Sequence, residues 1–105
     1  MTIDQTLAAL ADPTRRGIVQ RLAHGRASAG QLAALSQFSR PATSQHLRVL
    51  RDAGVVRRTS GSRQSPYELD PATLIVLESW LSGLVDTWRT SPLPGHVEKT
   101  RGAVP

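Results

Sequence analysis

The stretch SRPATSQHLRVLRDAG, residues 39–54, decides the fold of this chain. Its apolar residues Leu47, Leu50 and Ala53 recur at helical spacing and predict one buried helix face. The opposite face comprises positions 41, 44, 45, 48 and 51 or 52, most of which carry hydrogen-bonding side chains of several lengths. A face that served solubility alone would more often hold Glu and Lys, so this face favours contact with a ligand over a merely solvated surface.

Both ends of this helix carry capping residues. Ser39 is expected to cap the first turn, which also accommodates Pro41. Gly54 is expected to end the helix in the left-handed conformation. The predicted helix therefore spans residues 40–53.

A short helix is expected immediately before it. Ser28 is expected to be the N-cap, and Gln31 three residues later completes a capping box. Leu32 and Leu35 are expected to point inward, and this helix ends near Gln37. The result is a helix, a tight turn and a second helix.

Two further helices are expected at the start of the chain. The first keeps helical spacing from Ile3 to Leu10. Asp12 and Pro13 then form a cap and first turn for a second helix over residues 14–24. Gly17 lies inside the second helix, where glycine costs about 1 kcal/mol relative to alanine, so we expect another helix to approach closely there. Side chains left to solvent or a ligand are Arg15, Arg16 and Arg21.

After Gly54 the apolar pattern changes from helical to alternating. VVRRTS, the turn residues GSRQS and then PYELD predict a two-stranded hairpin over about residues 55–69. Tyr67 and Leu69 share one face of its second strand. Pro66 cannot donate to a ladder, so the strand is expected to be an edge strand at that point.

Asp70 and Pro71 repeat the pattern of Asp12 and Pro13, an N-cap followed by proline in the first turn. A long helix is therefore expected from there to about Thr90. Its apolar band is wider than one buried stripe requires, which favours a homodimer contact over packing entirely on this chain's own core. The expected dimer interface comprises Leu7, Leu10, Leu74, Leu77, Leu81, Leu84 and Trp88.

Length and composition limit the organisation of the protein. With 105 residues, the chain is sized for one compact domain, expected over residues 1–90, followed by a flexible tail over residues 91–105. It has no cysteine, which excludes disulfides and thiolate sites. We find neither a membrane-spanning stretch nor a secretory signal and expect a cytoplasmic protein with no membrane partner.

The positive charge is concentrated in the middle of the chain. Residues 13–63 hold ten arginines and one acid, Asp52, which gives this segment a charge of +9 within a chain of net charge +5. A generally soluble surface would intersperse the two signs, so the asymmetry indicates a polyanionic partner. We infer that the partner is nucleic acid.

Together these elements predict a mainly α fold with a small β-hairpin (α+β), the layout of a winged helix-turn-helix. The helix over about residues 40–53 would enter the major groove, where Ser44, Gln45 and Arg48 can reach base edges. Residues expected to contact the DNA backbone near the helix start are Ser39, Arg40 and Thr43, and those of the wing are Arg57, Arg58 and Arg63. For the wing arginines, a basic edge strand that prevents aggregation is the alternative interpretation.

The sequence offers no catalytic constellation. Ser44 and His46 are two residues apart on a helix and face different directions, so they form no nucleophile and base pair. There is no phosphate-binding loop, no HExxH motif and no glycine-rich dinucleotide turn. We therefore expect no enzyme activity and no cofactor.

Three stretches, LADPTRRGIVQRL, SRPATSQHLRVLRDAGVV and YELDP, resemble in order and spacing the ArsR (ArsR/SmtB) family of small dimeric bacterial repressors. The resemblance covers about residues 7–88. It implies a winged-helix homodimer, joined by its first and last helices, that binds an imperfect palindrome and releases it on sensing a ligand. By position, Ser44 and Gln45 match the base-reading residues of the recognition helix, and Arg57, Arg58 and Arg63 match the wing.

This chain departs from the family at the metal-sensing positions. The expected third helix, SAGQLAALSQ, has no thiolate, and residues 74–88 have no histidine, so we expect no metal at either usual site. A site at the termini or between subunits stays open, as does the identity of the effector. We expect a repressor that binds double-stranded DNA as a homodimer; the alternative is a winged-helix interaction module that docks a protein through its last helix.

Overall fold

The computed structural model of the chain describes residues 2–35, 39–59 and 65–92. Its elements follow in the order predicted from the sequence. They are α1 (Ile3–Leu10), α2 (Pro13–Leu22), α3 (Ala29–Leu35), α4 (Arg40–Asp52), β1 (Val56–Arg58), β2 (Tyr67–Leu69) and α5 (Pro71–Thr90). The predicted α+β winged helix-turn-helix architecture is confirmed.

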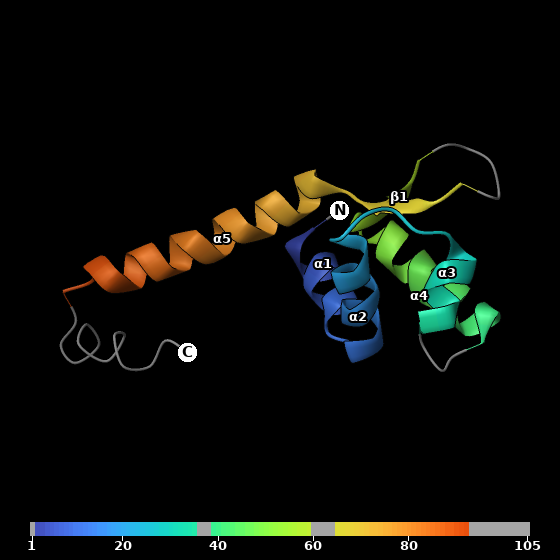
Figure 1. The fold of residues 1–105 in the computed structure, drawn as a ribbon. Coiled ribbons are helices and arrows are strands. Elements are labelled where there is room, and N and C mark those ends of the chain that lie inside the picture. The colour runs from blue at the N-terminus through green and yellow to red at the C-terminus, as the bar shows by residue number, and fades with distance from the viewer. Residues whose placement is uncertain (1, 36–38, 60–64, 93–105) are drawn as a thin grey trace.

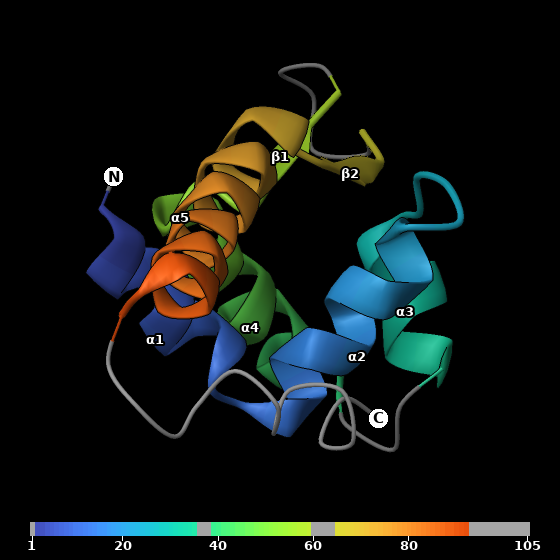
Figure 2. The ribbon, with the colours of Figure 1, turned by 90° about the vertical axis from the view of Figure 1, so that its left-hand side faces the viewer.

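The first four helices and the hairpin form one body, and α5 projects away from it (Figure 1). Seen from the side toward which α5 projects, α5 points toward the viewer, with α1 on the same side of the body and α2 and α3 on the other side (Figure 2). The main packing partner of α5 is α1. The long helix is therefore attached at its N-terminal end and unsupported along most of its length.

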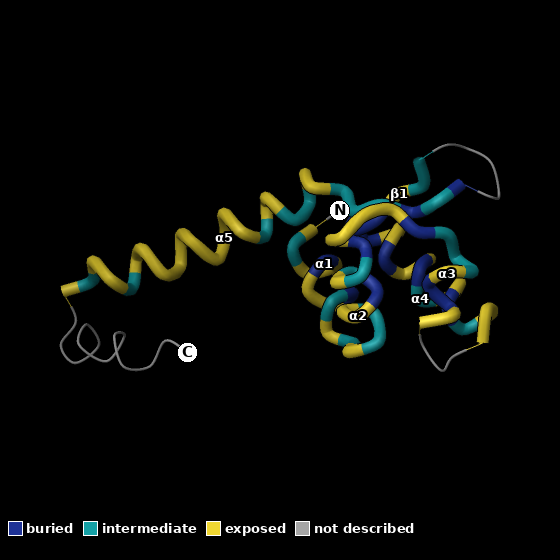
Figure 3. The backbone as a smooth tube through the Cα atoms, in the orientation of Figure 1, coloured by how far each residue is buried: buried dark blue, intermediate teal, exposed yellow. Residues whose placement is uncertain are grey.

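The core is built around the inner face of α4. Leu47, Leu50 and Val55 are completely buried, and Ile18, Leu22 and Leu32 pack around them from α2 and α3. The buried residues that the structure describes lie in the body, whereas α5 has none and is exposed along most of its length (Figure 3). The predicted buried face of Leu47, Leu50 and Ala53 is confirmed.

The predicted caps are present. The Ser28 hydroxyl accepts a hydrogen bond from the Gln31 N–H at 3.1 Å, and the Ser28 N–H donates to the Gln31 side chain at 2.8 Å. The carboxylate of Asp12 accepts from the Arg15 N–H, and that of Asp70 accepts from the Ala72 N–H. Gly25 and Gly54 have φ values of 139° and 77°, so both helix ends require glycine.

The second strand is paired on both sides. In the hairpin Val56 lies opposite Leu69, and Arg58 lies opposite Tyr67. On its other side, the Tyr67 N–H donates to the Ala27 carbonyl at 2.8 Å, and the Ala27 N–H donates to the Tyr67 carbonyl at 3.0 Å. Sequence reasoning placed an edge at Pro66 and missed this bridge, because a single residue of the loop before α3 carries no strand pattern.

Three local predictions were wrong. Leu35 is 65% exposed, because α3 is short and buries Leu32 and Ala33 instead. The second helix ends at Leu22, two residues earlier than expected. No helix approaches Gly17 closely, since a Cβ atom built there would meet no atom within 4 Å.

The arginines of α2 donate hydrogen bonds to backbone carbonyls of the chain. Arg15 donates from Nε to the Ala9 carbonyl at 2.6 Å, and Arg16 donates from Nη1 to the carbonyls of Leu10 and Ala11. These bonds satisfy carbonyl groups at the C-terminus of α1, where a positive charge is favoured. Arg21 likewise donates to the carbonyl of Gly25 after α2. Part of the positive charge therefore has a structural role.

We expect Gly17→Ala to raise the free energy of unfolding by about 1 kcal/mol, because alanine is the better helix former and its methyl group has open space. Gly25→Ala is the matched control. It also has open space, but its φ of 139° lies in the left-handed region, so this variant should lose stability. Denaturant unfolding of both variants checks the prediction, and a Gly17→Ala variant less stable than the parent would contradict it.

Candidate nucleic-acid interface

The outer face of α4 is polar and open. Ser44, Gln45 and Arg48 are exposed, on the side opposite the buried Leu47 and Leu50. Their side chains increase in length and carry donors and acceptors suited to base edges. The helix is thus packed against the body through one face, and its opposite face is exposed to solvent.

The start of α4 presents further polar groups. Ser39 caps the helix, its hydroxyl accepting from the Ala42 N–H at 3.3 Å, and it remains exposed. Arg40 is also exposed, and its guanidinium carbon lies 3.9 Å from the point where a Cβ on Gly30 would sit. Arg40 therefore lies where α3 and α4 meet, at the N-terminus of α4.

Thr43 does not belong to this face. It is 2% exposed, and its side chain packs in the core beside Leu47. Its hydroxyl forms no hydrogen bond with any other residue that the structure describes. A buried side chain cannot reach a phosphate, so the expected backbone contact of Thr43 is corrected to a packing role.

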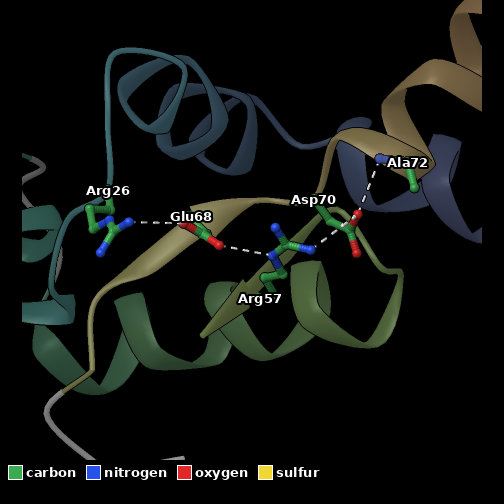
Figure 4. Close-up of polar contacts among 5 residues, drawn as sticks. All are labelled: Arg26, Arg57, Glu68, Asp70 and Ala72. Atoms are coloured by element: carbon green, nitrogen blue, oxygen red, sulfur yellow. Dashed lines mark hydrogen bonds and ion pairs between the residues drawn. The ribbon is translucent and has the colours of Figure 1, made fainter. Parts of the chain in front are cut away.

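The wing arginine Arg57 is held by two carboxylates. Its Nε donates to Glu68 Oε2 at 2.9 Å, and its Nη1 lies 4.0 Å from Asp70 Oδ1 (Figure 4). Glu68 faces Arg57 because the two residues are partners in the ladder between β1 and β2. Arg57 is about half exposed, so a phosphate could reach it only in competition with these acids.

Arg58 is held by an aromatic ring. Its guanidinium carbon lies 4.9 Å from the ring centroid of Tyr67, and its Nε and Nη2 donate to the Tyr67 hydroxyl at 3.0 and 2.7 Å. Stacking on tyrosine leaves the charge in place while restricting the side chain. The third wing residue, Arg63, lies outside the described residues.

Asp12 carries the one resolved pKa shift among the described residues. The hydrogen bond from the Arg15 N–H lowers the pKa of Asp12 below its ordinary value of 3.8, and burial opposes this shift. The positive charges of Arg15 and His46 lower the pKa further. Asp12 therefore serves as a charged cap and has no feature of a general acid.

The candidate dimer surface runs along α5. This helix has no buried residue, although Leu74 packs partly against the core. Leu81 and Leu84 are 47% and 51% exposed, and Leu7 of α1 is 40% exposed. Leu10, Leu77 and Trp88 are half-buried. Apolar side chains left open in a row along one helix are typical of an interface that another chain covers.

The part of the chain that the structure describes has neither a cluster of metal ligands nor a membrane-spanning helix. No group of three or more His, Cys, Asp and Glu residues comes together there to hold a metal ion. None of the described helices is both long enough and apolar enough to cross a membrane.

Sequence reasoning missed two residues of this surface. Arg26 lies beside the hairpin, with its Nη2 3.8 Å from Glu68 Oε1. Glu68 itself lies between two arginines. The alternating pattern of the hairpin indicated that Glu68 faces opposite to Tyr67, but nothing local placed the loop before α3 beside that strand.

Comparison with known proteins identifies relatives of this chain. The family described as "Bacterial regulatory protein, arsR family" matches residues 12–58, the region from the cap of α2 to the end of β1. The HTH-type transcriptional regulator Rv2034 of Mycobacterium tuberculosis is 46% identical over 96 residues, which cover 90% of this chain and 85% of that protein.

Solved structures agree with this result. The crystal structure of an ArsR family transcriptional regulator superposes with a TM-score of 0.76 at 28% identity, covering 84% of this chain and 91% of its own. A homodimeric winged helix-turn-helix DNA-binding domain from Mycobacterium bovis shares the fold, with a TM-score of 0.64 at 19% identity, covering 90% and 86%.

We expect Thr43→Val to raise the free energy of unfolding by about 1 kcal/mol, because valine has the same shape and removes a buried hydroxyl without a partner among the described residues. DNA affinity should stay unchanged. Ser44→Ala, one position along on the exposed face, should show the opposite pattern, with lower affinity and a free energy of unfolding that rises by no more than about 0.5 kcal/mol. Denaturant unfolding and DNA titration measure the two quantities, and a loss of affinity in Thr43→Val equal to that in Ser44→Ala would restore Thr43 to the contact surface.

Proposed function

The chain belongs to the ArsR family of bacterial transcriptional regulators, and we propose that it is a repressor that binds a palindromic operator as a homodimer. The observation that carries the proposal is the difference between the two faces of α4. One face is buried through Leu47 and Leu50, and the opposite face is polar and exposed. We assign no catalytic step to the protein, since its relatives are transcriptional regulators. A regulator of transcription acts on chromosomal DNA, so we place this protein in the cytoplasm.

Base reading is assigned to the exposed face of α4. An α-helix fits the major groove of B-DNA, where each base pair presents a distinct pattern of donors and acceptors. Gln45 can form two hydrogen bonds to adenine, and Arg48 can form two to guanine. Ser44 is short and reaches either a base edge or a nearby phosphate.

Backbone contacts are assigned to the residues around this face. Ser39 and Arg40 lie at the N-terminus of α4, where free backbone N–H groups and the helix dipole favour an anion. Arg57 and Arg58 extend the basic surface along the wing, and we propose the same role for Arg63. Such contacts fix the position of the protein on DNA and carry no sequence information themselves.

A second copy of the chain is assigned to the apolar surface of α5 and α1. A helix of 20 residues with no buried side chain gains little from its own body, so covering its leucines with a second copy removes them from water. The homodimeric Mycobacterium bovis domain supports this arrangement by its likeness in fold. A two-fold dimer presents two copies of α4, and we expect half-sites about 34 Å apart, one turn of DNA.

A footprint on the DNA upstream of the protein's own gene tests the proposal. We expect a protected palindrome, with affinity that falls steeply as salt increases because phosphate contacts release counterions. Repeating the footprint with candidate effectors tests ligand-controlled release in the same assay. Equal affinity for upstream and random DNA at physiological salt would contradict a sequence-specific regulator.

We expect Gln45→Ala to relax base preference, with a loss of about 1–3 kcal/mol of discrimination at one position of each half-site. Gln20→Ala is the matched control, because Gln20 is exposed on α2 outside the proposed interface. Titrating a set of operators with single base changes measures the discrimination. If Gln45→Ala weakened all of these sequences equally, Gln45 would be a backbone contact.

We expect Leu84→Glu to weaken dimerisation about 100-fold or more, because the two-fold interface would bury an unpaired carboxylate from each copy. The single chain should still fold, since Leu84 is 51% exposed in it. Ile75→Glu, at an exposed position on the other side of α5, is the control. Sedimentation equilibrium measures the association. A Leu84→Glu variant that stayed dimeric would relocate the interface, and a parent chain that was monomeric without DNA affinity would favour the interaction module.

A further inference from the structure

Four charged residues meet at the base of the wing, where β2, β1 and the loop before α3 lie side by side (Figure 4). Glu68 is at the centre, with Oε2 2.9 Å from Arg57 Nε and Oε1 3.8 Å from Arg26 Nη2. Arg57 Nη1 also lies 4.0 Å from Asp70 Oδ1. Both oxygens of Glu68 therefore face an arginine, and the cluster of two arginines and two acids is neutral overall.

The two kinds of charge differ in exposure. The side chains of Arg26 and Arg57 are 64% and 53% exposed, whereas those of Glu68 and Asp70 are 27% and 24% exposed. The guanidinium groups thus lie outermost, where a polyanion can reach them. The carboxylates lie beneath them.

The two acids, Asp70 and Glu68, have different structural roles. Asp70 Oδ1 accepts a hydrogen bond from the Ala72 N–H at 3.1 Å and so caps α5. Glu68 caps no helix, and its ion pairs are with Arg26 and Arg57 alone among the described residues. Its position is set by the ladder, in which it lies opposite Arg57.

We propose that Glu68 limits the sequence-independent affinity of this protein for DNA by holding Arg26 and Arg57 away from phosphates. The inference rests on the proposed function, because it concerns how the same surface binds DNA. Glu68 is a positioning residue that acts through the two arginines. A phosphate that approaches either arginine must compete with this carboxylate and is repelled by it.

The expected effect is modest but measurable. Exposed ion pairs are weak, so removing the Glu68 charge should tighten binding to random duplex DNA about two- to five-fold. Each arginine released to a phosphate displaces a further counterion. The slope of log affinity against log salt should therefore become steeper, by up to about 0.9 per added contact.

The experiment compares Glu68→Gln with the parent chain on a random-sequence duplex, by titration over a range of salt. Glutamine keeps the size and polarity of the side chain and removes its charge. Asp86→Asn is the matched control, since Asp86 is an exposed acid on α5 without an ion pair among the described residues. The control changes the net charge by the same amount, but it removes no ion-pair partner of Arg26 or Arg57. Salt screens the interaction between exposed charges that are more than about 10 Å apart.

A second comparison tests whether the effect passes through the arginines. Glu68→Gln is repeated in an Arg26→Gln and Arg57→Gln background, where we expect the gain in affinity to disappear. Circular dichroism checks that each variant is folded. The proposal would be overturned if Glu68→Gln raised the affinity for random DNA equally in both backgrounds, or if Asp86→Asn raised it as much as Glu68→Gln does. Either result would mean that the change in net charge alone explains the effect.

The remaining outcomes separate this inference from the proposed function. If the parent chain binds DNA and Glu68→Gln binds random DNA no more tightly, the inference fails and the proposed function stands. If the parent chain binds neither random nor upstream DNA even at low salt, the proposed function fails and the inference fails with it.

Discussion

Burial of the inner face of α4 is the interaction on which the rest of the structure depends. Leu47 and Leu50 have no exposed surface, and α4 packs against α1, α2, α3 and β1. Burying one such leucine contributes about 1.5–3 kcal/mol, a large fraction of the net stability of a small domain. Because this contact fixes the rotation of α4, it also determines that Ser44, Gln45 and Arg48 face outward. Stability and recognition are therefore assigned to opposite sides of one helix.

The distribution of arginine partners is a second constraint. In the sequence the basic segment reads as a uniform surface of charge +9. In the structure Arg15 and Arg16 bond to carbonyls at the end of α1, and Arg57 is paired with acids of the wing. By contrast, Arg40 and Arg48 are exposed and form no ion pair among the described residues. Within the described part of the chain, Arg40 and Arg48 thus have no acid that would compete with a phosphate, whereas Arg57 on the wing is already paired with Glu68.

The long helix α5 differs from the rest of the described chain in how little of its apolar surface is buried. The body buries its own apolar residues, while α5 is exposed along most of its length (Figure 3). Its residues Leu81 and Leu84 are 47% and 51% exposed. Its cap, Asp70, is within reach of Arg57, so the wing and the start of α5 share one polar cluster. The helix proposed for dimerisation is therefore connected directly to the element proposed to contact the DNA backbone.

The sequence by itself determined the order of the elements and most of their boundaries. Caps such as Asp12, Ser28 and Ser39 are local signals, because the hydrogen bond joins residues three apart. The period of the apolar residues likewise identified the inner face of α4. The exposed base-reading candidates followed from the same period, but the expected DNA-backbone contact of Thr43 did not. Its place on the helix borders both faces, and only packing against the core decides that it is buried.

The tertiary structure alone decided which distant residues meet. The pairing of Ala27 with Tyr67 joins residues 40 positions apart, and it brings Arg26 beside Glu68. No local propensity or spacing encodes such a contact, because it depends on how α2, α3 and the hairpin pack around α4. The sequence thus supplied the charges of the wing, and the fold determined which of them neutralise one another.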